Sequence, residues 1–259
     1  MITLLRSEER RHVQHGRQES WLSFHPHDRP GSPFESFAAL VGLDELRLPP
    51  DATLGPQPHL ETEVVTYVYE GALAHQDSGG PSGVMHAGEF SYAAVDRKAR
   101  SRETNASRTN WARVFRISLR PPEVGLVCAS ERKHFAAALR HNVLRAVASF
   151  DGRRGSLLTR QDAVIYSSVL DPGHHLIHEI APHRRAWLHL ISGEARSLGI
   201  VLTPGDGVGA TMEHAISLTA QGKAEIMLID LGPEPRPGYG TDAPVKDKPP
   251  DAPPSGSEE

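Results

Sequence analysis

Histidine and carboxylate side chains are the residues of this chain best suited to chemistry. Fifteen histidines are spread along its 259 residues, and His25-Pro-His27 has the spacing of a paired metal ligand. A metal site needs at least a third ligand, so we interpret this pair as part of a polar surface loop. The single cysteine, Cys128, has no helix N-terminus or basic partner beside it. It is therefore interpreted as a small buried residue rather than a nucleophile.

Several functional classes lack their sequence signals. No Gly-x-Ser-x-Gly motif supports a hydrolase, and Gly79-Gly80 is typical of a hairpin rather than of a phosphate-binding loop. A net charge of -4 and a pI near 6.4 give no electrostatic footprint for nucleic acid. No apolar run approaches the ~20 residues that a membrane span needs. The single cysteine excludes an internal disulfide framework and indicates a reducing, cytoplasmic setting.

Short apolar runs punctuated by glycine and proline must position these side chains. The runs are residues 63–69, 84–94, 114–119, 164–170, 186–191 and 226–231. Several alternate with period two, which predicts short strands in an all-β sandwich or barrel. Only residues 131–141, which include Phe135-Ala-Ala-Ala-Leu139, favour a helix.

The expected domain organisation follows from these patterns. We predict an N-terminal β-domain with the active pocket at 1–120, a connector at 121–150, and a C-terminal β-domain at 151–232. Residues 233–259 are polar, rich in proline and nearly free of large apolar side chains. Such a segment buries too little surface to offset the entropy of ordering it, so we expect a disordered tail.

Three segments of the first half carry a family resemblance. They are residues 55–71, residues 75–78 with 87–90, and residues 100–105; matching segments in the second half are 155–157, 161–162, 184–188, Gly193 and 204–206. Their order and spacing resemble the pirin family over about residues 1–232. The resemblance implies a bicupin, with two antiparallel jelly-roll β-barrels packed face to face. It also implies one Fe(II) in the N-terminal barrel, held by a His-x-His pair and a later His-x-Glu pair.

This chain departs from the implied ligand set. The corresponding positions are Gln57 and His59, followed by Ser101 and Glu103. Both losses are histidines, and an amide oxygen or a hydroxyl is a poor donor to divalent iron. We therefore expect these four positions to be the remnant of a metal site, with no metal bound. The alternative is a relocated histidine, with His25-Pro-His27 as the candidate, that completes an iron site.

A second departure lies in the run 114–119. The matching family strand commonly reads Gln-x-Trp, whereas this chain has Arg116 and Ser118. By strand alternation the two side chains share one face. If that face lines the barrel, Arg116 forms an ion pair with Glu103 that replaces the charge of the metal, and Ser118 enlarges the pocket; the alternative is an Arg116 that points into solvent. We expect Gln57, Ser101, Arg116 and Ser118 to contact the substrate.

These residues predict a metal-independent small-molecule enzyme. Glu103, if it lies in an apolar pocket, would act as a general acid or base, and His59 would shuttle the proton. The expected reaction is non-oxidative, such as cyclisation, dehydration or isomerisation of a carbonyl-containing metabolite in specialised biosynthesis, and needs no cofactor. One alternative is an Fe(II)-dependent enzyme resembling quercetin 2,3-dioxygenase. Another is a non-catalytic ligand-binding protein or transcriptional co-regulator.

The expected partner is a small-molecule substrate bound by a monomer, with no nucleic acid and no membrane. Three further residues receive structural interpretations. Glu63 is expected to be a hydrogen-bonded strand residue, His75 to fix a hairpin turn, and His178 to be either a surface histidine or a satisfied histidine of the second barrel.

Overall fold

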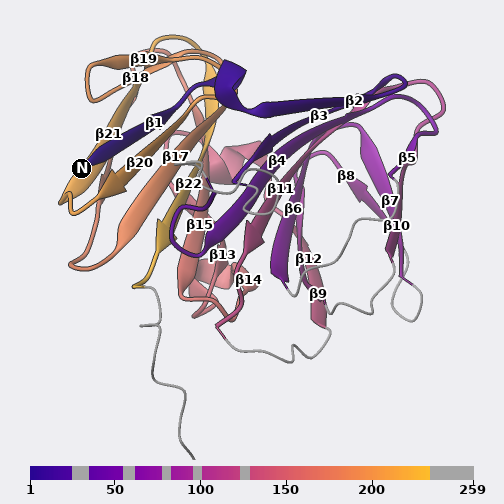
Figure 1. Ribbon diagram of the computed structural model, residues 1–259, viewed down its shortest axis with the longest axis horizontal. Helices are drawn as coiled ribbons and strands as arrows, with labels where there is room; N and C mark the ends of the chain where they lie inside the picture. The colour runs from indigo at the N-terminus through magenta and orange to yellow at the C-terminus, as the bar shows by residue number, and fades with distance from the viewer. Residues whose placement is uncertain (25–34, 55–61, 78–82, 96–100, 123–128, 234–259) are drawn as a thin grey trace, which may run out of the picture.

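Two β-barrels make up the described part of the chain. The computed structural model describes residues 1–24, 35–54, 62–77, 83–95, 101–122 and 129–233. Each barrel combines a seven-stranded sheet with a four-stranded sheet, and the barrels lie side by side in Figure 1. The all-β fold predicted from the short apolar runs and the two-barrel plan implied by the family resemblance are both confirmed. The predicted tail lies, after Pro233, outside the described residues.

The N-terminal barrel is formed by a seven-stranded sheet and a four-stranded sheet. The larger sheet has the order β12 (Ala129–His134), β9 (Glu89–Val95), β6 (Thr62–Glu70), β11 (Ala112–Leu119), β4 (Leu40–Leu48), β3 (Gln18–Ser23) and β2 (Arg11–His15). The smaller sheet has the order β5 (Thr53–Leu54), β10 (Ser101–Asn105), β7 (Ala72–Asp77) and β8 (Gly83–His86).

The C-terminal barrel repeats this plan. Its larger sheet has the order β1 (Ile2–Leu5), β20 (Gly207–Thr211), β17 (Arg185–Ser192), β22 (Ala224–Leu231), β15 (Ala163–Leu170), β13 (Arg145–Ser149) and β14 (Leu157–Leu158). Its smaller sheet has the order β16 (His175–Glu179), β21 (Ala215–Ala220), β18 (Ala195–Ser197) and β19 (Ile200–Leu202). The short 3-10 helices are η1 (Ser7–Glu9), η2 (Ala137–Arg140) and η3 (Arg153–Gly155).

The strand pairing differs from the predicted domain boundaries at both ends of the N-terminal domain. Strand β1 pairs with β20 and so belongs to the C-terminal sheet, whereas the sequence predicts an N-terminal domain over residues 1–120. Conversely, β12 pairs with β9 of the N-terminal sheet, and β13 pairs with β15 of the C-terminal sheet. The predicted connector 121–150 therefore contains strands of both barrels. Pairing between distant strands decided these assignments, and local composition carries no signal for it.

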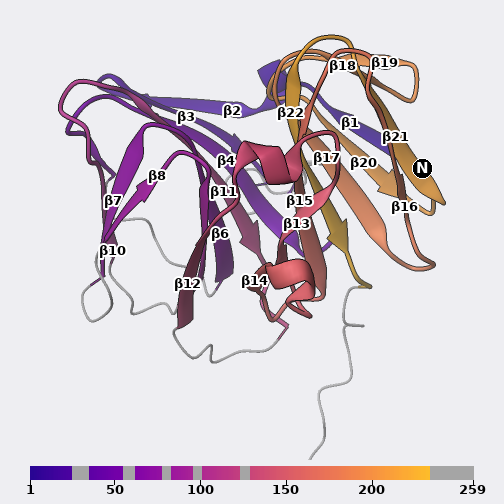
Figure 2. The same ribbon diagram turned by 180° about the vertical axis from the view of Figure 1, so that it is seen from behind.

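The helix predicted over residues 131–141 is wrong. Its first half is the edge strand β12, and only Ala137–Arg140 form a single 3-10 turn, η2. Helix nucleation is costly, and a run of about ten residues without packing support is marginal. Hydrogen bonding to the open edge of β9 decides the conformation instead. Figure 2 shows η2 at the junction of the barrels.

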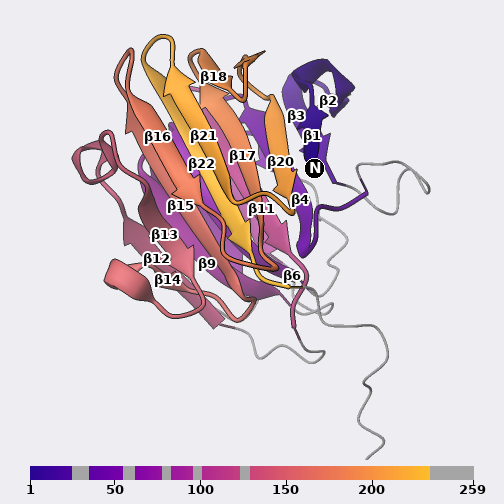
Figure 3. The same ribbon diagram turned by 90° about the vertical axis from the view of Figure 1, so that its left-hand side faces the viewer.

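The largest buried apolar cluster lies between the barrels rather than inside either one. From the N-terminal sheet it includes Val65, Tyr67, Phe90, Phe115 and Ile117, and from the C-terminal sheet Ile165, Trp187, Met227, Ile229 and Leu231. Figure 3 shows the two larger sheets stacked face to face. Because these residues alternate along their strands, the intervening residues face the barrel interiors.

A buried charge network crosses the same interface. Arg140 Nη1 donates to Glu225 Oε1 at 2.6 Å, and Tyr67 from the N-terminal barrel donates to the same oxygen at 2.6 Å. Arg140 also donates to Ser167 Oγ at 2.7 Å and is only 3% exposed. Glu63, which is fully buried, joins the barrels through hydrogen bonds from the backbone N–H groups of residues 160 and 161. The interpretation of Glu63 as a hydrogen-bonded strand residue is confirmed.

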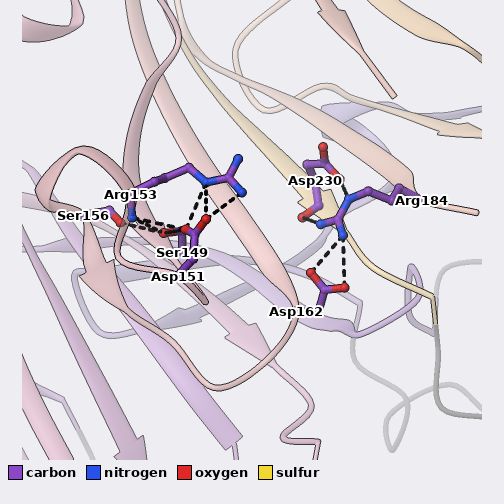
Figure 4. Close-up of polar contacts among 7 residues, drawn as sticks. All are labelled: Ser149, Asp151, Arg153, Ser156, Asp162, Arg184 and Asp230. Carbon is purple, nitrogen blue, oxygen red and sulfur yellow. Dashed lines mark hydrogen bonds and ion pairs between the residues drawn. The ribbon is translucent and has the colours of Figure 1, made fainter. Parts of the chain in front are cut away.

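The C-terminal barrel contains two clusters of ion pairs, which are shown in Figure 4. In one, Arg153 binds Asp151 through both carboxylate oxygens, with Ser149 and Ser156 hydrogen-bonded to each other alongside. In the other, Arg184 joins Asp162 to Asp230. His178 Nε2 lies 2.8 Å from Asp230 Oδ2, so of the two interpretations of His178 the satisfied barrel histidine is confirmed.

Glycine is required at equivalent turns of the two barrels. Gly71 follows β6 with φ +78°, and Gly193 follows β17 with φ +82°. A Cβ at either position would overlap the neighbouring strand backbone, at Trp111 O and at Lys223 O respectively. Within the described ranges, no helix is both long and apolar enough to cross a membrane.

Arg140→Met should destabilise the protein, because it leaves the Glu225 carboxylate buried without its cation. Removing one partner of a buried pair typically costs about 3–5 kcal/mol, measurable by urea unfolding. Tyr67→Phe removes one hydrogen bond and should cost about 1 kcal/mol. An Arg140→Met protein as stable as the wild type would show that this network does not hold the barrels together.

Candidate functional site

The interior of the N-terminal barrel is apolar at one end. Its buried cluster contains Leu46, Leu48, Leu54, Val68, Leu73, Met85, Ala112 and Val114, contributed by strands of both sheets. Beyond this cluster, β11 presents Arg116 and then Ser118 on the same face. The polar end of the barrel therefore holds the candidate reaction centre.

Arg116 and Glu103 form an ion pair across this interior. Arg116 is on β11 of the larger sheet and Glu103 is on β10 of the smaller sheet, and Arg116 Nη2 contacts Glu103 Oε2. Both side chains are largely buried, with 15% and 13% of their surfaces exposed. The ion pair predicted from strand alternation is confirmed, and the alternative of an outward-pointing Arg116 is wrong.

Two further groups complete the charged centre. Asp44 on β4 is opposite Arg116 in the strand register, and His75 on β7 is opposite Glu103. His75 Nδ1 lies 3.5 Å from Glu103 Oε1. Burial lowers the pKa of Arg116 to about 10, and the Asp44 carboxylate opposes that shift. Arg116 thus holds its charge between two carboxylates.

The structure changes the expected environment of Glu103. The sequence led us to expect an apolar pocket that favours the neutral acid, but a guanidinium and an imidazole contact the carboxyl group. An opposite charge at this range favours the carboxylate form. The environment of Glu103 is therefore charged rather than apolar.

His75 is the residue that the sequence interpretation missed. It was expected to fix a hairpin turn, whereas it lies within β7 and faces Glu103. The two residues are 28 positions apart, and only the β7–β10 register joins them. The alternation of Leu73 and His75 on one side of the strand was the available signal.

The remaining predicted site residues are placed only in part. Ser118 lies opposite Gly42, where an added Cβ would come 3.2 Å from Ser118 Cβ, so small residues face each other here. Gln57, His59, His25, His27 and Cys128 lie outside the described residues, and Ser101 is described by its backbone alone. Their predicted roles stay predictions.

An iron ion does not fit the described donor set. No three His, Cys, Asp or Glu side chains among the described residues are arranged to hold a metal. Glu103, the carboxylate at the implied ligand position, contacts a guanidinium that carries its own fixed positive charge. A metal bound at Glu103 would have to displace Arg116 or accept repulsion from it.

The two cupin-type barrels and this interior site define a bicupin, and comparison with known proteins agrees. The Pirin family model matches residues 7–117, and the model of the quercetinase C-terminal cupin domain matches residues 146–231. The quercetin 2,3-dioxygenase of Escherichia coli K12 is 33% identical over 233 residues, covering 90% of this chain and 100% of that protein. The chain belongs to the pirin family.

Solved structures show the same architecture. The bacterial pirin YhhW from Escherichia coli, in complex with nickel(II), superposes with a TM-score of 0.83 at 33% identity, covering 90% of this chain and 100% of that one. A quercetin 2,3-dioxygenase from Acinetobacter baumannii gives a TM-score of 0.71 at 17% identity, covering 89% of this chain and 87% of that chain, and so shows the fold alone.

A double-mutant cycle tests the ion pair. Glu103→Gln and Arg116→Gln should each lower the free energy of unfolding, and the double variant should lose less than the sum. We expect a coupling of about 1–3 kcal/mol, as for contacting charges. Urea unfolding of the four proteins measures it. Additive losses would show that the two groups do not interact in solution.

Proposed function

We propose that the N-terminal barrel catalyses a metal-independent acid–base reaction on a neutral carbonyl compound. The observation that carries the proposal is the Arg116–Glu103 ion pair, which puts a fixed cation and a proton acceptor side by side in a mostly buried site. Two carboxylates surround one arginine, so the site favours a neutral substrate over an anionic one.

Each group has a role in this reaction. A substrate carbonyl oxygen would accept hydrogen bonds from the Arg116 guanidinium, which stabilises the negative charge of an enolate. Glu103 would take the proton from the carbon next to the carbonyl, leaving the bonding electrons in the enolate. His75, 3.5 Å from Glu103, is placed to pass that proton on.

The outcome depends on where the proton returns. Return to another carbon gives an isomerisation, and transfer to a departing hydroxyl group gives a dehydration with release of water. Attack of the enolate carbon on a second carbonyl group gives a cyclisation. None of these steps changes the oxidation level of the system. His59 stays our expected second proton carrier, and Gln57, Ser101 and Ser118 our expected substrate contacts.

An Fe(II)-dependent dioxygenase reaction is the second candidate. It is favoured by similarity along 90% of the chain to a protein named quercetin 2,3-dioxygenase. The loss of two histidine ligands and the charge of Arg116 weigh against it. A histidine placed outside the described residues would be needed to complete its site.

Hydrogen–deuterium exchange tests the acid–base proposal without knowledge of the natural substrate. In D2O, the wild type should accelerate exchange of the α-protons of neutral enolisable ketones such as cyclohexanone, followed by proton NMR. Glu103→Gln should reduce that acceleration by roughly 10²–10⁴-fold. Glu89→Gln, which alters an ion pair with Arg132 elsewhere in the barrel, is the matched control and should keep it.

Two results would overturn the proposal. Undiminished exchange in folded Glu103→Gln protein would remove Glu103 from the chemistry. Oxygen uptake with quercetin that requires added Fe(II) would establish the second candidate instead.

A further inference from the structure

A hollow of about 470 Å³ lies outside the barrel interior, on the opposite face of the same strands. It is lined by Glu19, Arg47, Glu70, Trp111, Ala112 and Arg113. We call it the seam hollow. Its residues come from the ends of β3, β4, β6 and β11, where the N-terminal sheet extends past the C-terminal barrel (Figure 1). Its size is that of a small-molecule site.

A cluster of three arginines around one glutamate contributes Arg47 and Arg113 to the lining of the seam hollow. The buried carboxylate of Glu45 lies 2.8 Å from Arg113 Nε, 3.3 Å from Arg10 Nη1 and 3.3 Å from Arg47 Nε. One carboxylate thus faces three guanidinium groups. Burial favours protonation of Glu45, but the charges of Arg113, Arg10 and Arg47 outweigh it, so its pKa lies below the ordinary value. The three arginines outnumber Glu45 within this cluster, and Glu19 and Glu70 of the lining balance the remaining positive charge.

A buried histidine beside this cluster is short of a partner. His189 is 2% exposed, packs against Phe115, and its Nε2 has no hydrogen bond within the described structure. Burial and the charges of Arg10 and Arg113 hold its pKa well below the ordinary value, so it adds no charge. In the lining itself, the Arg113 side chain is only 14% exposed, and a largely desolvated guanidinium favours an anionic partner.

Arginine donors reach the hollow in fixed orientations. Glu45 binds the Nε atoms of Arg47 and Arg113, and Arg113 Nη2 donates to the backbone of residue 191 at 3.0 Å. Arg47 is also stacked over Trp21 at 4.8 Å. The hydrogen bonds found among the described residues use Nε of Arg47 and Nε and Nη2 of Arg113, and the Arg47 side chain is 45% exposed. These guanidinium groups are preorganised for a ligand.

The walls restrict the kind of anion. Trp111 is 43% exposed and offers an aromatic surface, with Arg17 5.5 Å from its ring centre. Glu19 and Glu70 also line the hollow, opposite Arg47 and Arg113 in the strand register, and repel additional negative charge. A ligand with one negative charge and a flat ring satisfies both constraints, whereas a phosphate dianion does not.

We propose that the seam hollow binds a small aromatic monocarboxylate, with its carboxylate on Arg47 and Arg113 and its ring against Trp111. The site is separate from the proposed reaction centre, since Arg47 and Arg113 lie on the opposite face of β4 and β11 from Asp44 and Arg116. The proposal therefore stands or fails independently of the acid–base reaction.

Calorimetry on the full chain, with benzoate as the probe, tests this assignment. The wild type should bind benzoate saturably and should not bind benzamide, which has the ring but not the charge. Arg47→Gln should weaken benzoate binding at least roughly tenfold, because a charge-assisted pair is lost. Arg196→Gln, an exposed arginine of the C-terminal barrel, is the matched control and should bind as the wild type does.

Each contrary outcome overturns the proposal. No saturable benzoate binding to the wild type would exclude the ligand class. Equal benzoate affinity in folded Arg47→Gln and wild-type protein would exclude the seam hollow as the site. Inorganic phosphate binding as tightly as benzoate would show an unselective anion site and remove the aromatic carboxylate.

Discussion

The burial of one sheet face against the other is the constraint on which the rest of this structure depends. Phe115 and Ile117 of β11 are fully buried in the inter-barrel core, which fixes the orientation of the whole strand. Alternation then sends Arg116 and Ser118 into the N-terminal barrel and leaves Arg113 in the seam between barrels. A one-residue shift in the pairing of β11 with its neighbours would turn Arg116 out of the barrel and Phe115 into it. The packing between the barrels therefore also positions both candidate sites.

Arg116 supplies the positive charge of the barrel interior from a side chain, whereas a metal site supplies it from a bound ion. Its cation is covalently attached, cannot be removed by a chelator, and offers N–H donors rather than open coordination positions. Such a group can bind and polarise an oxygen atom but cannot accept electrons or bind dioxygen. A family scaffold shared with proteins named quercetin 2,3-dioxygenase is thereby compatible with a different reaction class.

The hydrophobic pattern along single strands predicts where the strands lie and which side chains share a face. Apolar runs located the strands β6, β11, β15, β17 and β22, and alternation placed Arg116 toward Glu103. Properties that depend on pairing between distant strands were missed. His75 meets Glu103 only through the β7–β10 register, and β1 joins the C-terminal sheet only through β20. The seam hollow was invisible for the same reason, since its arginines are far apart in sequence.

Metal content is the most direct test of the claim that a guanidinium has replaced the metal. The wild type and a Gln57→His, Ser101→His, Arg116→Gln variant would be purified without affinity metal, reconstituted anaerobically with Fe(II), desalted and measured by mass spectrometry. The account predicts less than about a tenth of an iron per wild-type chain, because two donors retain iron poorly, and a clear gain in the variant. Close to one iron per wild-type chain would contradict it.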